Sequence, residues 1–481
     1  MADKEEKELF YSNLIGTSAV EVASLTLVGT LVVFLRSQLQ PWLIVTKPPT
    51  KKHSCFVFVI DFLTMILPMV TCCTYGSDHI QHVLVLLLVA AITLHLIQPG
   101  DLKPSVHSYL ESSVSSAKLP FVSSLRLCVL FSTTISILAV DFHIFPRRFA
   151  KTETFGVSLM DGGVGMFIFI NGLVSSEART KQLPSGLVSK LSKVQSNMMT
   201  SLPLLLLGLM RLLSVRLADY HQHVSEYGVH WNFFLSLFFV RIISSLLFVI
   251  IPISFSGMLL LLVTFTYQHL LTNCGLQEYI LNGPDGTGSR IGWISANREG
   301  IFSCIGFTSI YLGGVSIGRL LFRKSWSFSG SVRLLGCLWG FTILFWCILN
   351  QLPSYTGEVS RRLGNASYIV WILAQGVFSL ATFLLVDIVL AWQQDTATKS
   401  DTDMFLHLKH PANQSNLLHG VNAHQLLFFL LGNLLTGLVN LTINTLTVSN
   451  LFSFLIIVFY MALLCSVTTV MQYKGIKFKF L

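Results

Sequence analysis

Charged side chains are scarce in this chain: Asp, Glu, Lys and Arg make up 11% of its 481 residues. Soluble domains carry about 25% charged residues, so this scarcity excludes an ordinary soluble protein. Hydrophobic residues reach 52%, and the mean hydropathy is +0.67. The composition therefore predicts a protein that crosses a membrane many times.

Metal and nucleic-acid signatures are also missing. The nine cysteines are scattered and none has the C-x-x-C spacing that is typical of structural metal sites, so we expect no metal centre and no disulfide framework. The formal net charge is +9, but the basic residues lie in short loops and form no stripe with interleaved aromatic residues. We therefore expect membrane lipids, and no nucleic acid, as partners.

About thirteen apolar runs are long enough to span a bilayer as helices. They lie at about 19–37, 55–75, 79–98, 121–141, 159–176, 197–215, 230–251, 254–272, 300–318, 331–350, 366–391, 423–443 and 450–470. The sequence predicts an all-α polytopic membrane protein with a single integral-membrane domain over residues 1–481. Polar residues without apolar periodicity at 393–421 predict a flexible cytosolic loop within it.

Lysine and arginine are distributed unevenly between alternate loops. About nineteen fall on one side of the predicted membrane and about ten on the other side, which includes the N-terminus. Because cytosolic loops carry the excess of Lys and Arg, the richer side is predicted to be cytosolic. An odd number of spans places the termini on opposite sides, so we expect a lumenal N-terminus and a cytosolic C-terminus.

Four compact polar clusters occupy the predicted lumenal loops. They are D-F-H-I-F-P-R-R-F-A-K-T-E at 141–153, Y-H-Q-H-V-S-E-Y-G-V-H-W-N at 220–232, a stretch at 283–300 that contains G-P-D-G-T-G-S-R and A-N-R-E-G, and E-V-S-R-R-L-G-N at 358–365. The cytosolic loops, in contrast, carry loosely spaced lysines. We expect the four clusters to assemble one polar site on the lumenal side.

Asp141 and Lys151 are the candidate catalytic residues of the first cluster. Asp141 ends an apolar run, where partial desolvation favours a carboxylate that accepts a proton. The ammonium group of Lys151 would stabilise an oxyanion or hold the carboxylate in place. The alternative for this spacing is a structural ion pair that closes a loop.

Two arginine pairs are candidate anion-binding residues. Arg147 and Arg148 follow a helix-breaking proline, and Arg361 and Arg362 lie in a second loop on the same side. Guanidinium groups at a lipid headgroup boundary suit a phosphate. Salt bridges within the loops are the alternative.

Four further polar residues are candidate substrate contacts. Asp161 falls just inside a span, where an ionisable group is costly and is usually functional or paired. His230 stands beside a tryptophan at the membrane interface. Asn297 and Arg298 begin a helix, where headgroup binding and helix capping are both possible.

Several long motifs occur in order along the chain. They are L-A-V-D-F-H-I-F-P-R-R-F-A-K-T-E, M-D-G-G-V-G, S-E-Y-G-V-H-W-N-F-F, D-G-T-G-S-R with S-A-N-R-E-G, V-S-R-R-L-G-N and F-L-L-G-N-L-L-T-G-L-V-N. Together they resemble the PIG-W/Gwt family, inositol acyltransferases of glycosylphosphatidylinositol (GPI) anchor biosynthesis in the endoplasmic reticulum. One departure is His143, where the family pattern has proline.

The resemblance implies a reaction and its residues. A fatty acyl group, usually palmitoyl, would pass from palmitoyl-CoA or a similar acyl-CoA to the inositol 2-hydroxyl of glucosaminyl-phosphatidylinositol. Asp141 would be the base and Lys151 its partner, and Arg147, Arg148, Arg298 and Arg361 would contact phosphates. Acyl-CoA is a co-substrate, so no cofactor or metal is implied.

Two other functions compete with an acyltransferase. A secondary transporter would show internal repeats and broken helices near the bilayer centre, and neither pattern is visible in the sequence. A non-catalytic lipid scaffold or flippase would explain the arginine pairs but would not need Asp141. Replacement of that aspartate by asparagine separates these alternatives from an enzyme.

Overall fold

The computed structural model describes residues 10, 12, 14–43, 51–97, 119–180, 186–217, 224–322, 327–397 and 416–476. Within these ranges the chain forms helices, and its one extended pairing is an isolated antiparallel bridge between Thr17 and Val157. Thirteen helical segments of the described chain are long and apolar enough to cross a membrane, and each overlaps one predicted run. The all-α polytopic fold is confirmed, and the orientation of the termini stays a prediction.

The spanning segments are formed by α2 (Ala19–Leu39), α3 (Lys51–Asp61) with η2 (Phe62–Ile66) and α4 (Leu67–Cys72), α5 (Ile80–Leu96), α6 (Pro120–Ala139), α7 (Leu159–Leu173) with α8 (Ser176–Arg179), α9 (Leu187–Leu217), α11 (Phe233–Ile250), α12 (Ser256–Asn273), α15 (Arg298–Phe322), α16 (Phe328–Gln351), α18 (Ala366–Ala397), α21 (Gln425–Thr442) and α22 (Asn450–Tyr473). Shorter helices in the connections are η1 (Gln40–Leu43), η3 (Ser77–His79), η5 (Arg147–Phe149), α10 (Val224–Tyr227), η6 (Ile253–Phe255), α13 (Leu276–Asn282), α14 (Trp293–Ala296), α17 (Pro353–Thr356) and α20 (Asn416–Ala423).

Side-chain caps begin three of the helices next to the polar loops. Ser18 accepts from the backbone N–H of Glu21 at the start of α2, and Ser158 accepts from Asp161 at the start of α7. Asn232 accepts from two backbone N–H groups at the start of α11. Because each cap satisfies N–H groups that lack an intrahelical acceptor, the helix starts at a defined residue and the preceding loop has a defined exit.

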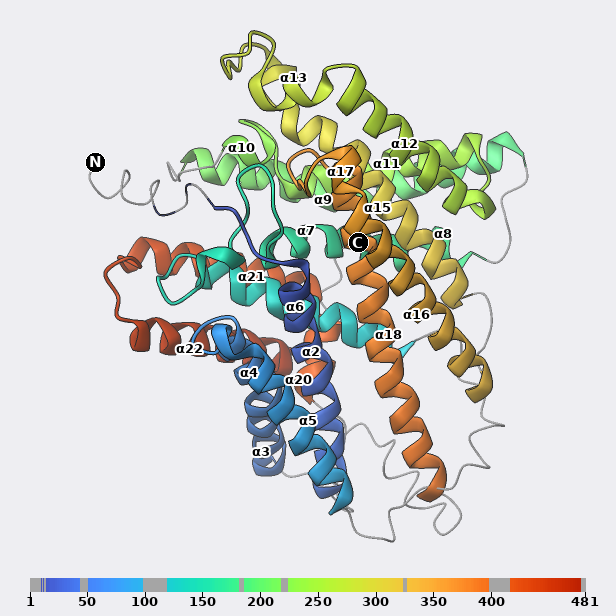
Figure 1. Cartoon of the computed structure of the whole chain (residues 1–481). Coiled ribbons are helices and arrows are strands. Elements are labelled where there is room, and N and C mark those ends of the chain that lie inside the picture. Colours follow the sequence, from blue (N-terminus) through green and yellow to red (C-terminus); the bar gives the residue numbers. More distant parts are fainter. Residues whose placement is uncertain are drawn as a thin grey trace.

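Buried apolar side chains form two large clusters. The first core joins α7, α11, α15, α16 and α18, and the second joins α2, α4, α6, α20 and α22 (Figure 1). The loop between α6 and α7, residues 140–158, contacts both cores. Its Phe142, Phe145 and Phe149 are buried in the second core, whereas Val157 belongs to the first. Apolar side chains therefore anchor a loop that carries a compact cluster of charged residues.

The predicted flexible loop at 393–421 is too long at both ends. Helix α18 continues to Ala397, and α20 begins at Asn416. Helix α20 forms within the predicted loop because Leu417 and Val421 are fully buried in the second core. Residues 398–415 of this prediction lie outside the described residues.

Two glycines allow the segment after α10 to lie directly against α15. Gly228 has φ +115°, and a Cβ there would approach Asn297 Cα to 2.5 Å. Gly300 lies in the first turn of α15, where a Cβ would approach Trp231 Cδ1 to 2.3 Å and Tyr227 O to 2.5 Å. Only glycine fits at these contacts, which position residues 227–231.

Gly300→Ala is expected to destabilise the protein by about 1–3 kcal/mol, because the added methyl group overpacks a close backbone contact. Gly336→Ala is the matched control, since that α16 glycine has open space where a Cβ would stand and alanine favours helix. Thermal unfolding of both variants in detergent measures the difference. Equal melting temperatures would contradict the close approach described here.

Candidate functional site

The four polar clusters of the sequence meet in the structure, apart from residues 220–223, which lie outside the described part of the chain. Three direct contacts connect them. They are Lys151 Nζ to Glu226 Oε2 at 2.9 Å, Arg362 Nη2 to Glu299 Oε1 at 2.9 Å, and the His230 backbone N–H to Asn297 Oδ1 at 2.7 Å. Asp161 of α7 links the first and fourth clusters, because it accepts from Thr152 N at 2.9 Å and from Arg361 Nε at 2.6 Å. We call this set of residues the polar network.

Asp141 lies in the tight turn that follows α6, and its exposed fraction is 7%. Asn440, near the end of α21, donates from Nδ2 to Asp141 Oδ2 at 2.7 Å. This amide fixes the orientation of the carboxylate and connects the loop to a distant part of the chain. From the sequence, a polar residue at this place in an apolar run could bond a neighbouring helix or line a cavity, with packing as the favoured interpretation, so Asn440 was not among the predicted site residues.

Arg147 holds the same turn. Its Nη2 donates to the carbonyl oxygens of Val140 at 2.8 Å and Phe142 at 3.3 Å, which flank Asp141, and to Phe145 O at 3.1 Å. Phe10 packs against the guanidinium at 4.0 Å. In this structure Arg147 therefore stabilises the turn that presents Asp141, and its predicted phosphate contact stays a prediction.

Lys151 forms its ion pair with Glu226 among the described residues, and the Lys151 and Glu226 side chains have exposed fractions of 30% and 28%. The Lys151 ammonium therefore contacts a carboxylate of α10 and not the Asp141 carboxylate. The prediction that both residues act on one substrate does not require them to touch, and it stays a prediction. Glu226 was not among the predicted site residues.

Asp161 and Arg361 form a buried ion pair, with exposed fractions of 0% and 2%. Asp161 Oδ2 also accepts from Thr152 N, Thr152 Oγ1 and Ser158 Oγ at 2.8–2.9 Å. Its place in the first turn of α7 adds a favourable interaction with the helix dipole. Burial alone would lower the pKa of Arg361, but the Asp161 carboxylate raises it above its usual value. The sequence predicted that an ionisable residue at this position would be functional or paired, and in the structure Asp161 is paired.

Glu299, the acid of the A-N-R-E-G motif, is a second buried anchor. Its carboxylate is fully buried and accepts two hydrogen bonds from Arg290, at 3.0 and 2.7 Å, and one from Arg362. One glutamate thus pairs with arginines of two loops. The sequence signal was the acid of A-N-R-E-G, which lies in the same predicted compartment as the two arginine pairs.

Arg298 is almost entirely buried and donates to backbone carbonyls. Its acceptors are Ile280 O at 2.9 Å, Ser289 O at 2.8 Å and Ser295 O at 3.1 Å. These bonds close the loop between α13 and α15. The predicted contact of Arg298 with a phosphate stays a prediction, and the structure gives this side chain a role in holding the loop.

Asn297 joins two loops rather than capping a helix with its side chain. It accepts from the backbone N–H of His230 and donates to Trp293 O at 2.8 Å. The half-buried His230 is thereby held against the start of α15 through its backbone. The substrate contacts predicted for Asn297 and His230 stay predictions.

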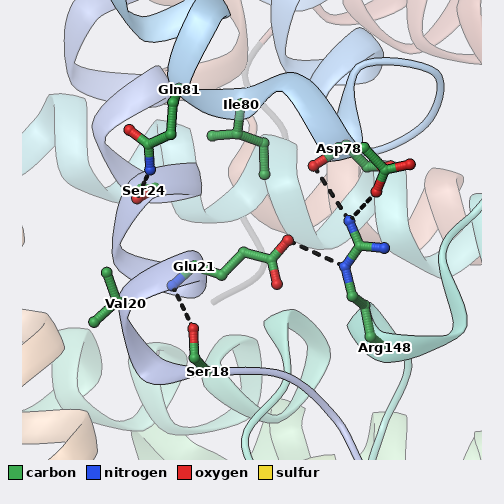
Figure 2. Close-up of a pocket in the computed structure, with 9 residues that line it drawn as sticks. Ser18, Val20, Glu21, Ser24, Asp78, Ile80, Gln81 and Arg148 are labelled. Atoms are coloured by element: carbon green, nitrogen blue, oxygen red, sulfur yellow. Dashed lines mark hydrogen bonds and ion pairs between the residues drawn. The ribbon is translucent and has the colours of Figure 1, made fainter.

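Arg148 borders a pocket of about 330 Å³ between α2 and the start of α5 (Figure 2). It donates to Glu21 Oε1 at 3.1 Å, to Asp78 Oδ1 at 2.6 Å and to Ser77 O at 3.2 Å. Two carboxylates around one guanidinium leave the group with a formal charge of −1. This arrangement ties the loop to α2 and disfavours a phosphate, so the predicted phosphate contact of Arg148 has no support from its surroundings.

Comparison with known proteins gives matches along the whole chain. A family model described as GWT1 matches residues 3–471. The chain is 33% identical over 510 residues to the glucosaminyl-phosphatidylinositol-acyltransferase PIGW of Bos taurus, covering 99% of this chain and 100% of that protein. For the Homo sapiens protein of that name the identity is 32% over 509 residues, with coverage of 99% and 100%. For the GPI-anchored wall transfer protein 1 of Gibberella zeae it is 36% over 510 residues, with coverage of 99% and 98%.

Proposed function

Because this chain belongs to the GWT1 family along nearly its whole length, we propose that it is a glucosaminyl-phosphatidylinositol acyltransferase of GPI-anchor biosynthesis. The observation that carries the proposal is the full-length match, at 33% identity, to a relative with that name. The donor is an acyl-CoA of the palmitoyl class, and the acceptor is the inositol 2-hydroxyl. The enzyme works in the endoplasmic reticulum membrane, with the polar network on the lumenal side.

Asp141 is the base of the reaction. Its carboxylate takes the proton of the inositol hydroxyl while the oxygen attacks the carbonyl carbon of the thioester. A carbon–oxygen bond forms, the tetrahedral intermediate collapses, and the carbon–sulfur bond breaks. Asp141 then returns the proton to the departing thiolate, so that the products are the acylated glycolipid and free CoA. The amide of Asn440 supports this role because it holds the carboxylate in one orientation.

Lys151 is the cationic partner of this step. Its ion pair with Glu226 is partly exposed, so the ammonium group can turn toward a substrate without leaving a fully buried charge behind. A thioester is already activated for acyl transfer. The remaining task of the protein is to position and deprotonate an alcohol, which the chain's own side chains can perform.

The test is acyl transfer by the purified full-length protein in lipid nanodiscs. With palmitoyl-CoA and glucosaminyl-phosphatidylinositol, we expect a product heavier by one palmitoyl group and one equivalent of free CoA thiol. An acceptor whose inositol 2-hydroxyl is methylated should give neither. Movement of the glycolipid between leaflets of proteoliposomes without acylated product would instead support the flippase alternative.

A further inference from the structure

Tyr227 and Arg361 each carry a buried hydrogen-bond donor that lacks an acceptor among the described residues. Among the described residues, neither the hydroxyl group of Tyr227 nor Nη1 of Arg361 has a hydrogen-bond partner. The exposed fractions are 8% for Tyr227 and 2% for Arg361. The guanidinium carbon of Arg361 lies 5.7 Å from the centre of the Tyr227 ring, so both donors belong to the same small region. Buried polar groups are nearly always paired, and each exception calls for an explanation.

Neither donor is loosely placed. Arg361 is held through Nε by the fully buried Asp161. The carbonyl oxygen of Tyr227 lies against Gly300, and the next residue, Gly228, is in close backbone contact with Asn297. Because the two side chains are already held in place, they need not reorient when an acceptor binds. Such preorganised donors are what stabilises a charge that develops in a transition state.

The buried cation of this region already has a counter-ion. Asp161 pairs with the Arg361 guanidinium inside the protein, so that charge is balanced at rest. A carbonyl oxygen becomes negative only in the transition state, which is when these two donors would stabilise it. Burial raises the pKa of Tyr227, so its hydroxyl keeps its proton at neutral pH and remains a donor.

We propose that Tyr227 Oη and Arg361 Nη1 donate to the carbonyl oxygen of the acyl thioester and stabilise the oxyanion of its tetrahedral intermediate. The inositol oxygen forms its bond to the carbonyl carbon, the carbonyl π electrons move to the oxygen held by these donors, and they return when the carbon–sulfur bond breaks. This inference rests on the proposed acyl transfer. Lys151 lies beside this site through Glu226, the neighbour of Tyr227 in α10.

Tyr227→Phe is expected to lower kcat by about 100-fold, since the lost bond is strongest to the oxyanion of the transition state, and to change KM for the glycolipid by less than about threefold. Its melting temperature should not fall, because the removed hydroxyl has no partner among the described residues. Tyr311→Phe is the matched control, a buried tyrosine whose hydroxyl lies 3.5 Å from Glu177 Oε2 in α8. We expect that variant to keep kcat within about threefold of the wild type.

A binding measurement tests the same contact without turnover. The probes are a long-chain ketone analogue of acyl-CoA, which keeps the carbonyl oxygen, and the corresponding thioether, which lacks it. Wild-type protein should bind the ketone more tightly by about 10-fold, and Tyr227→Phe should lose that preference. Equal affinities in the wild type, or unchanged kcat in an active Tyr227→Phe enzyme, would overturn the inference. Weaker glycolipid binding by this variant, with an intact ketone preference, would also overturn it and would assign the donors to the acceptor.

The outcomes also separate this inference from the proposed function. If the wild-type protein forms no acylated glycolipid, the proposed function fails, whatever Tyr227→Phe does. If the wild type forms it and Tyr227→Phe forms it equally fast, the acyltransferase stands and only the oxyanion site is wrong.

Discussion

Asp141→Asn is expected to lower the rate of acyl transfer by at least about 100-fold, since general base catalysis contributes about 10²- to 10⁴-fold and the amide cannot accept the proton. The variant should fold, because asparagine is nearly isosteric and its side-chain carbonyl can still accept the hydrogen bond from Asn440. Binding of acyl-CoA and of the glycolipid should stay within a few-fold of the wild type. Product formation and equilibrium binding, measured on the same preparation, give both quantities.

Asp285→Asn is the matched control for this experiment. It makes the same chemical change at an exposed loop carboxylate that accepts from Thr287 and belongs to no part of the proposed machinery. We expect its turnover to stay within about twofold of the wild type. Full activity of Asp141→Asn would contradict the assignment of the base, and loss of both activity and substrate binding would indicate a scaffold role for this residue.

Asp161→Ala is expected to destabilise the protein by about 3–5 kcal/mol, because it leaves the guanidinium of Arg361 buried without its counter-ion. It also removes the acceptor of Thr152 and Ser158, so the loop that carries Lys151 loses its attachment to α7. Thermal unfolding in detergent should show the largest decrease in melting temperature among the single variants considered for this protein.

The double variant Asp161→Ala/Arg361→Met separates charge from packing. Removing both charges should recover part of the lost stability, since an apolar side chain replaces an unpaired buried cation. Activity should not return, because Arg361 Nη1 is one of the proposed oxyanion donors. If the double variant lost more stability than the two single variants lose together, the ion pair would not explain the destabilisation by Asp161→Ala.

The sequence predicted the spans well because a bilayer imposes a simple requirement. A helix that crosses it needs about twenty apolar residues, and that length can be counted directly. Even the short break between the predicted runs at 230–251 and 254–272 appears in the structure, where η6 separates α11 from α12. The predicted flexible loop at 393–421 extends into α20, because the burial of Leu417 depends on contacts with helices distant in the sequence.

The candidate site was predictable in its parts and not in its pairings. Charge clusters on one predicted side indicated a common site, and the structure joins them. The sequence offered Lys151 as the partner of Asp141, yet in the structure the lysine contacts Glu226 and the aspartate contacts Asn440. Ion-pair partners depend on distances across loops of different helices, which residue spacing along one loop does not determine.

The sequence by itself determined that this chain is an all-α membrane protein of one family, with about thirteen predicted spans, and that its rare charges gather in a few loops. Hydropathy and motif order are properties of the linear chain. The tertiary structure decided which arginines are committed to structural carboxylates and carbonyls, and which donors remain without a partner among the described residues. The physical reason is that a buried polar group is defined by what surrounds it in space. Tyr227 has the hydrogen-bonding capacity of any other tyrosine until the packing of α10, α15 and the 358–365 loop encloses it.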